Sequence, residues 1–375
     1  MALAGCGELE EQAHAQAQIG GPPPGVLPAG VYTGPPLARL PDGPVLWSSG
    51  ERATGQGETQ VQGAQADYRR LARAQGGLLA CGLTDTKRGY FSGLTGRHSC
   101  VVHGPGGQRR EILPRSRSGR RGFHDVVVRG GVLVASSGDA VEVRDLRTGR
   151  KLGEARTAGA QRALHLPGLI INTGPAVRSG AAALIPTEAG LAHVRMLDNG
   201  RGWRVWSQSV TWTDRGIRLG PPASAPLPPE LARIAHTLTL TGGGLDGRRF
   251  LLGSDHPRLI VIAELAGAPA EALVRWSGEA PALSDLDVQG VAENGVVGLG
   301  AHGSADRAAL LVNLRGQAPA LKPLALKQPA CAVTRRPGQP PPTTVRFISG
   351  PAGLEAVAEW PGRLARCWST TPVTP

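Results

Sequence analysis

The sequence predicts an all-β protein, and three observations lead to that class. Many short apolar runs are separated by glycine and proline, of which the 375-residue chain contains 54 and 32. Several runs alternate between apolar and polar residues with a period of two, which is typical of half-buried strands. Because 41% of the residues are apolar, this composition indicates strands joined by tight turns rather than a disordered chain.

The segment 123–154 shows the strand pattern most clearly. Residues 126–128, 132–135 and 140–144 read as three successive strands, and residues 145–150 lead into a fourth around 151–152. Glycine, serine and aspartate between the strands suit tight hairpin turns, because glycine adopts positive φ readily and aspartate tolerates it. Four short antiparallel strands in succession make one blade of a β-propeller.

This blade resembles the repeat of the quinoprotein-type propellers. In that repeat a strand, a small-residue turn with Gly-Asp, an alternating strand, an Asp and a Thr-Gly turn follow one another. The run VLVASSGDAVEVRDLRTGRKL has this order, with Asp145, Thr148 and Gly149 at the matching positions. Gly153 stands where the family usually has a tryptophan. The resemblance covers one blade well and implies the architecture alone.

A tryptophan-containing phrase recurs along the chain and extends the prediction to six or seven four-stranded blades. It includes Trp47, Trp206, Trp276 and Trp368, and one large aromatic per blade would fill the wedge between neighbouring sheets. We expect an N-terminal strand to complete the last sheet, because ring closure removes exposed edges. Residues 68–73 are expected to form a short helical turn. The predicted blades are 31–51, 65–112, 123–154, 161–207, 208–262, 259–300 and 305–370.

The N-terminus predicts a disordered tether over residues 1–25, followed by the propeller over residues 26–375. Leu3-Ala4-Gly5-Cys6 resembles the lipobox of bacterial lipoproteins. That resemblance implies lipid attachment at Cys6 and an extracytoplasmic, membrane-anchored protein. Only five residues precede Cys6, fewer than a signal peptide needs. Either the true start lies upstream of Met1, or Cys6 is an ordinary cysteine of a cytoplasmic protein.

Four cysteines remain besides Cys6, an even number that suits disulfides in an oxidising compartment. Pairing Cys81 with Cys100 and Cys331 with Cys367 is the simplest of three connectivities, because each pair lies within one predicted blade. The alternative is four unrelated buried thiols.

Six arginines lie close together between two predicted blades and form a candidate anion-binding loop. The chain has a net charge of +12, and all but four of its 41 basic residues are arginine. Guanidinium groups bind phosphate and carboxylate groups, so an acidic protein or an anionic envelope polymer would suit this loop. No aromatic residue lies among the arginines, which argues against stacking on single-stranded bases. A solvated basic loop is the alternative. The arginines are Arg109, Arg110, Arg115, Arg117, Arg120 and Arg121.

No motif predicts catalysis, a metal or a cofactor. His98, Cys100 and His103 have ligand types at close spacing, but nothing fixes the nearest further candidates, His124 and Asp125, beside them. Ordinary histidines and one half of a disulfide are the better account. The glycines of 242–247 match a dinucleotide motif, but a strand follows instead of a helix, so we expect a hairpin. The carboxylates cluster near turns, where aspartates commonly bond their own backbone.

We therefore expect a non-catalytic, monomeric, extracytoplasmic propeller that binds another protein or an envelope polymer. Fold alone is weak evidence for function, so two alternatives stay open. One is a propeller enzyme or small-ligand binder with its site at the central channel. The other is a cytoplasmic basic propeller that binds nucleic acid.

Overall fold

The computed structural model describes most of the chain from residue 35 onward. The described ranges are 35–53, 57–59, 66–89, 93–116, 123–136, 140–157, 162–166, 169–173, 178–188, 190–198, 202–213, 216–242, 247–255, 259–278, 287–291, 296–300, 309–314, 321–330, 344–350, 353–360 and 366–373.

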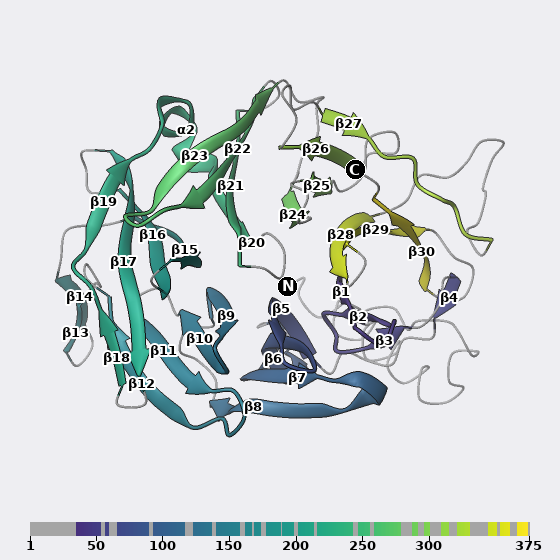
Figure 1. The fold of residues 1–375 in the computed structure, drawn as a ribbon, viewed down its shortest axis with the longest axis horizontal. Helices are drawn as coiled ribbons and strands as arrows, with labels where there is room; N and C mark the ends of the chain where they lie inside the picture. Colours follow the sequence, from purple (N-terminus) through teal and green to yellow (C-terminus); the bar gives the residue numbers. More distant parts are fainter. Residues whose placement is uncertain are drawn as a thin grey trace, which may run out of the picture.

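Within these ranges the protein is an all-β propeller, whose sheets follow one another around a ring in chain order (Figure 1). Five sheets are each built from consecutive strands and form five blades. The β5–β8 blade contains β5 (Ala66–Ala74), β6 (Gly77–Gly89), β7 (Gly93–His103) and β8 (Arg109–Ser116). The β9–β12 blade contains β9 (Asp125–Arg129), β10 (Val132–Ser136), β11 (Ala140–Asp145) and β12 (Lys151–Arg156).

The other three blades span residues 178–323. The β15–β19 blade contains β15 (Arg178–Thr187), β16 (Gly190–Asp198), β17 (Trp203–Thr213), β18 (Gly216–Leu219) and β19 (Ala223–Pro226). The β20–β23 blade contains β20 (Thr239–Gly242), β21 (Arg249–Asp255), β22 (Leu259–Ala266) and β23 (Glu271–Gly278). The β24–β27 blade contains β24 (Asp287–Val291), β25 (Val296–Gly300), β26 (Ala309–Asn313) and β27 (Leu321–Pro323).

A seven-stranded sheet joins the two ends of the chain, with the order β3-β2-β1-β28-β29-β30-β4. Its N-terminal strands are β1 (Pro36–Arg39), β2 (Val45–Trp47), β3 (Arg52–Ala53) and β4 (Gly57–Thr59). Its C-terminal strands are β28 (Thr344–Gly350), β29 (Gly353–Trp360) and β30 (Arg366–Pro372). β1 pairs in parallel with β28, and β4 pairs antiparallel with β30. The expected N-terminal contribution to the last sheet is therefore present.

The remaining described elements are short. β13 (Arg162–Leu166) and β14 (Leu169–Thr173) form a separate two-stranded sheet. The helical elements are η1 (Pro105–Gly107), α2 (Pro229–Arg233) and η2 (Ala235–Thr237). No helix among the described residues is long and apolar enough to span a membrane.

The prediction for segment 123–154 is confirmed, because its four strands form one sheet in the order β12-β11-β10-β9. Burial explains the sequence pattern. All five residues of β10 are buried, whereas β11 alternates and β12 is buried at none of its six residues. Strands deep in the ring are covered on both faces and read as continuous apolar runs, while outer strands face solvent.

Several predicted boundaries are wrong. Residues 68–73 belong to β5 instead of a helical turn, because they pair with β6 across the sheet. Residues 162–173 form the separate β13–β14 hairpin rather than the first strands of a blade. The predicted boundary between 207 and 208 divides the 11-residue β17, which pairs with β19 in its first half and with β18 in its second.

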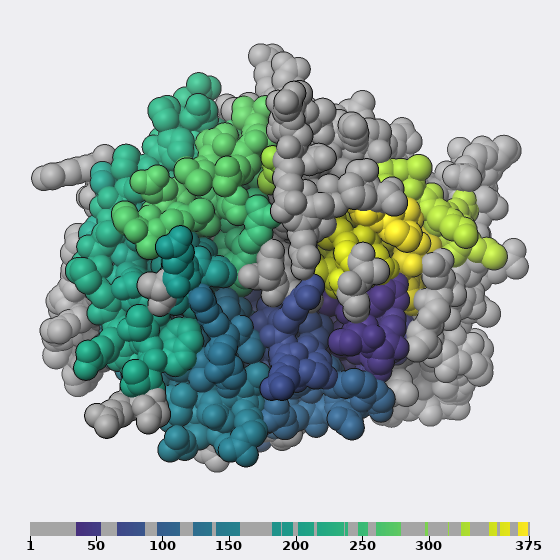
Figure 2. Space-filling view, viewed as in Figure 1, coloured from purple at the N-terminus to yellow at the C-terminus, as the bar shows by residue number. Residues whose placement is uncertain are grey.

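The core lies in layers between neighbouring blades, which pack side by side around the ring (Figure 2). One layer joins the β9–β12 and β15–β19 blades, with Val134, Val143, Leu184 and Leu191 all fully buried. Two predicted tryptophans meet in the seven-stranded sheet. Trp47 and Trp368 are buried and lie edge to face, with ring centroids 5.8 Å apart.

A buried ion pair joins three blades. Asp125, at the start of β9, accepts hydrogen bonds from Arg249 Nε at 2.7 Å and Nη2 at 2.9 Å. Its carboxylate also accepts from the backbone N–H of Val126 at 2.9 Å and of Leu184 at 2.7 Å. The Asp125 and Arg249 side chains are only 6% and 4% exposed. The β9–β12, β15–β19 and β20–β23 blades are therefore held by one fully hydrogen-bonded carboxylate.

A basic cleft between two blades as the candidate functional site

A cleft of about 360 Å³ lies between strand β8 and the turn that joins β11 to β12. The turn forms because Asp145 bonds its own backbone: its Oδ1 accepts from the Thr148 N–H at 2.6 Å and from Thr148 Oγ1 at 2.7 Å. Both bonds lower the pKa of Asp145, and the bond from the Thr148 hydroxyl has the larger effect. The cleft is lined by Glu111, Ile112, Arg144, Thr148, Gly149, Arg150 and Lys151.

Gly149 completes the turn for two reasons. Its φ of +74° lies in the left-handed region that favours glycine, and a Cβ there would lie 2.6 Å from the carbonyl oxygen of Ile112. The turn therefore approaches β8 closely. The Asp-Thr-Gly pattern that indicated a propeller repeat thus also forms one wall of the cleft.

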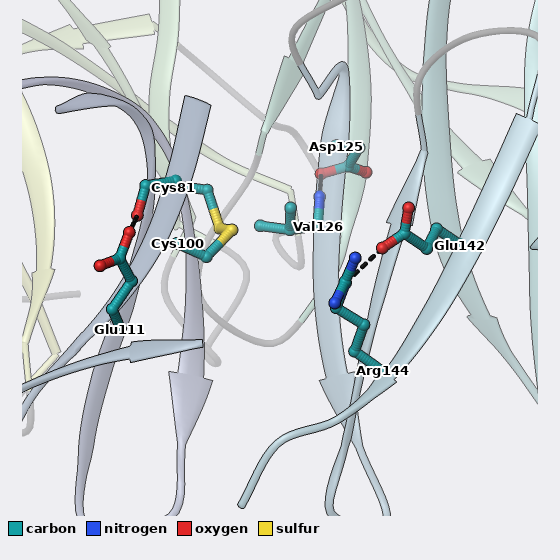
Figure 3. Close-up of a disulfide and its surroundings, with 8 residues drawn as sticks. Cys81, Cys100, Glu111, Asp125, Val126, Glu142 and Arg144 are labelled. Carbon is teal, nitrogen blue, oxygen red and sulfur yellow. Dashed lines mark hydrogen bonds and ion pairs between the residues drawn. A yellow bond between two sulfur atoms is a disulfide. The ribbon is translucent and has the colours of Figure 1, made fainter. Parts of the chain in front are cut away.

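The lining carries more positive than negative charge. Three cations, Arg144, Arg150 and Lys151, face one carboxylate, that of Glu111, which gives a formal lining charge of 3 − 1 = +2. Arg144 pairs with Glu142, as Figure 3 shows, and donates to the carbonyl of Gly149 at 2.9 Å. The Glu142 carboxylate therefore neutralises part of the charge behind the cleft.

Two of the three cations are directed to solvent. Lys151 is 43% exposed and pairs with Glu154, which is also at the surface. The Arg150 side chain is exposed. The Glu111 carboxylate accepts from Ser99 Oγ at 2.7 Å, so this acid is already hydrogen-bonded within its own blade.

More arginines lie at the same end of the two blades, and two of them point away from the cleft, because Arg109 donates to Tyr68 Oη and Arg129 donates to carbonyls of the β15–β19 blade. Arg109 and Arg73 lie on one row across the β5–β8 blade, through the pairs Arg73 with Leu78, Leu78 with His103, and His103 with Arg109. Arg110 donates from Nη1 to the carbonyl of Arg147 at 2.6 Å and so joins the two walls. The side chains of Arg73, Arg109, Arg110, Arg129 and Arg147 are all exposed.

The structure gives a partial view of the predicted anion-binding loop. Arg110 reaches the turn beside the cleft, whereas Arg109 donates to Tyr68 Oη at 3.2 Å on the other face of the blade. Both residues lie in strand β8 instead of a loop, because β8 pairs with β7. The backbone of Arg115 also belongs to β8. Its side chain, and Arg117, Arg120 and Arg121, lie outside the described residues.

Sequence reasoning missed Arg144, Arg150 and Lys151. All three flank the Asp-Thr-Gly turn, whose end of the blade faces the arginine-rich segment. The sequence does show basic residues on both sides of that turn. It does not show that strand β8 of the neighbouring blade lies beside them.

The cysteine residues are oxidised where the structure describes them. Cys81 and Cys100 are opposite one another on β6 and β7 and form a disulfide (Figure 3). Cys367 is also disulfide-bonded, while Cys6 and Cys331 lie outside the described residues. Disulfides persist in oxidising compartments, so the Cys81–Cys100 bond indicates an extracytoplasmic location.

The residues considered as possible metal ligands have the following surroundings. Cys100 is occupied by its disulfide. His103 is fully buried against Tyr68, with ring centroids 5.4 Å apart, and burial lowers its pKa to about 4. Burial also lowers the pKa of His98. Among the described residues, no group of three or more His, Cys, Asp or Glu side chains could hold a metal ion.

The strands on either side of the glycine-rich segment pair with each other, as expected for a hairpin, while residues 243–246 lie outside the described residues. β20 and β21 pair antiparallel, with Gly242 opposite Arg249. A dinucleotide site needs a helix at this point, and β21 is a strand.

Comparison with known proteins reaches the fold only. No known protein family and no curated protein matches the sequence. A solved candidate 6-phosphogluconolactonase from Bacteroides fragilis aligns with a TM-score of 0.45 at 10% identity, covering 91% of this chain and 97% of its own. BamB from Moraxella catarrhalis aligns with a TM-score of 0.38 at 12% identity, covering 89% and 95%. The Cps50 (Swd1) β-propeller domain of Myceliophteria thermophila gives 0.36 at 13%, covering 86% and 89%. At these identities the likeness says nothing about function.

Proposed function

We propose that this protein is a non-catalytic, extracytoplasmic β-propeller that binds an anionic partner, an acidic protein segment or an envelope polymer, at the basic cleft. The observation that carries the proposal is the excess of cations over carboxylates in the lining of the cleft. Exposed Arg110 and Arg147, which meet where the two blades join, add to this charge. Guanidinium groups bind carboxylates and phosphates through paired N–H donors, so either chemistry would be recognised.

The proposal agrees with how the described carboxylates are used. Asp125 is bonded by Arg249, and Glu355 accepts from Arg39 at 2.6 and 2.7 Å. Glu264 lies between Arg248 and Arg275, each at 2.9 Å. These acids hold strands together, which a scaffold for binding needs.

The proposal also includes the organisation of the chain. Residues 26–375 would form one propeller, and residues 1–25 a tether whose Cys6 carries a lipid. The sequence Leu3-Ala4-Gly5-Cys6 and the oxidised Cys81–Cys100 pair support export. We count the seven-stranded sheet as two blades, one built on β1–β3 and one on β28–β30 with β4, which would give seven in all.

The test removes charge at the cleft and leaves charge elsewhere unchanged. Fluorescently labelled poly-glutamate and a glycerol-phosphate polymer represent the two partner chemistries, and a DNA duplex represents the nucleic-acid alternative. We expect the Arg150→Ala/Lys151→Ala variant to bind its polymer about tenfold more weakly, which is about 1.4 kcal/mol. Added salt should weaken polymer binding by the wild type more than polymer binding by this variant, because salt screens exposed charges.

The matched control is Arg218→Ala/Arg233→Ala, two exposed arginines of the β15–β19 blade and helix α2. It changes the net charge by the same amount and should leave affinity within twofold of the wild type. If both double variants weaken binding equally, only net charge matters and the cleft is not the site. Preference for the DNA duplex over both other polymers would favour the nucleic-acid reading instead.

A further inference from the structure

Polar side chains interrupt the apolar layer between the β9–β12 and β15–β19 blades. Side chains of β16 alternate between the two faces of its sheet. Val194 packs in the cluster shared with the β20–β23 blade, whereas Leu191 packs against the β9–β12 blade. His193 and Arg195 have the same parity as Leu191 and so face the β9–β12 blade.

Arg195 is buried, and none of the described carboxylates pairs with it. It is 7% exposed, and no described carboxylate lies within ion-pair distance of its guanidinium group. Its one hydrogen bond to a described residue is long, from Nη1 to Thr157 Oγ1 at 3.4 Å. Burial lowers the pKa of Arg195, with no neighbouring acid to oppose the effect. An isolated buried cation is costly, and proteins normally pair it or bind an anion there.

A second unsatisfied donor lies beside it. Trp206, on β17, is directly opposite Arg195 in the strand pairing. Its indole Nε1 is buried and has no hydrogen-bond partner among the described residues. Directly opposed residues point to the same face of a sheet, with Cβ atoms roughly 5 Å apart. The Arg195 and Trp206 side chains therefore lie on the same face of the sheet, at neighbouring positions of β16 and β17.

The chemistry of this group is that of donors alone. Arginine and the tryptophan indole can donate hydrogen bonds and cannot accept them. No hydrogen bond joins His193 to Arg195 among the described residues, and the His193 Nε2 is bonded to Ser136 Oγ at 2.9 Å. Asp125 lies opposite Ser136 in the pairing of β9 with β10. Its carboxylate already accepts hydrogen bonds from Arg249 and from two backbone N–H groups.

We propose that Arg195, Trp206 and Thr157 form a binding site for one oxyanion group, the carboxylate or phosphate of a small ligand, between the two blades. The guanidinium would bind two oxygens of the ligand, and the indole N–H and the Thr157 hydroxyl would bind from the sides. The site would make the protein a small-ligand binder in addition to a partner-binding propeller.

This site is separate from the basic cleft. Thr157 directly follows the last residue of β12, whereas the cleft lies at the first residues of that strand. Arg195 likewise lies three residues before the end of β16, far along the strand from its turn with β15. The two sites are therefore at opposite ends of their blades.

The first experiment titrates the protein with inorganic phosphate, sulfate and acetate at constant ionic strength, with chloride as the reference. Thermal melting and tryptophan fluorescence are the readouts. We expect one of the oxyanions to raise the melting temperature saturably and to change the fluorescence. A larger response to phosphate and sulfate would identify a phosphate-type ligand, and a larger response to acetate would identify a carboxylate. A response that never saturates, or that chloride reproduces, would overturn the proposal.

Two variants locate the effect. Arg195→Met should melt at a higher temperature than wild type without oxyanion, because it removes an unpaired buried charge, and should lose the response. Trp206→Phe keeps an aromatic ring and removes the N–H donor, so affinity should fall by about fivefold, the value of one hydrogen bond of about 1 kcal/mol. The exposed Arg218→Gln on β18 is a control that should respond like wild type. Unchanged oxyanion binding in both Arg195→Met and Trp206→Phe would refute the site.

Discussion

Replacing Arg249 with alanine tests how strongly the buried ion pair joins three blades. The substitution removes the bonds from Nε and Nη2 to Asp125, at 2.7 and 2.9 Å, and leaves a carboxylate that is 6% exposed with only two backbone donors. Breaking a buried pair by removing one partner costs about 3–5 kcal/mol, because the remaining charge is uncompensated. With an unfolding entropy of about 2.1 cal/mol/K per residue, the midpoint of thermal unfolding should fall by roughly 4–6 °C.

The assay is thermal unfolding followed by tryptophan fluorescence at neutral pH. The neighbouring Arg248→Ala is the matched control, because Arg248 is 28% exposed and its partner Glu264 keeps Arg275. We expect this control to lose about 1 kcal/mol or less. Asp125→Asn combined with Arg249→Met should recover part of the loss by removing both charges. Equal destabilisation by Arg249→Ala and Arg248→Ala would show that the pair has no special role.

Three further predictions concern the disulfide, acid sensitivity and the N-terminus. Replacing both Cys81 and Cys100 with alanine should lower the free energy of unfolding, measured with denaturant, by about 3 kcal/mol, because the disulfide closes a loop between residues 19 apart. Unchanged stability would mean that the thiols are not paired in solution. His103 has a folded pKa of about 4, below its ordinary 6.5, so its unfolded form binds the proton more readily. Stability should therefore be complete above pH 6.5 and fall between pH 6.5 and 4. His103→Phe should flatten part of that fall in melting curves, and an unchanged pH profile would contradict the assignment. Expressed with its native upstream sequence, the protein should fractionate with membranes and Cys6→Ser should release it; equal membrane retention would exclude the lipid anchor.

The sequence was sufficient for the fold class because strand alternation and turn chemistry are local. The four strands β9–β12 could be located from their valines and the residues between them. The boundaries after residue 157 could not, because β17 alone looks like the end of one blade and the start of the next. Only its pairing with both β18 and β19 shows that it belongs to one sheet.

The candidate site was only half predictable for a similar reason. Arg110, which reaches the turn beside the cleft, belongs to a visible run of arginines, but that turn comes from the next blade. Arg150 and Lys151 acquire their role from the distance between β8 and the Gly149 turn, which the spacing along the chain does not encode. Arg195 and Trp206 are likewise unremarkable in sequence, and only strand register makes them neighbours.

The pairing of β4 with β30 has a consequence for the order of synthesis. Residues 57–59 are among the first of the described chain to be made, yet their partner strand spans Arg366–Pro372. The outer strand of that sheet therefore has no partner until almost the whole polypeptide exists. The individual blades can fold as they are made, but the ring can close only after residues 366–372 have been made, or translocated if the chain is exported unfolded. Until then an unpaired strand edge is exposed at each end of the chain, which makes this interval the one most prone to aggregation.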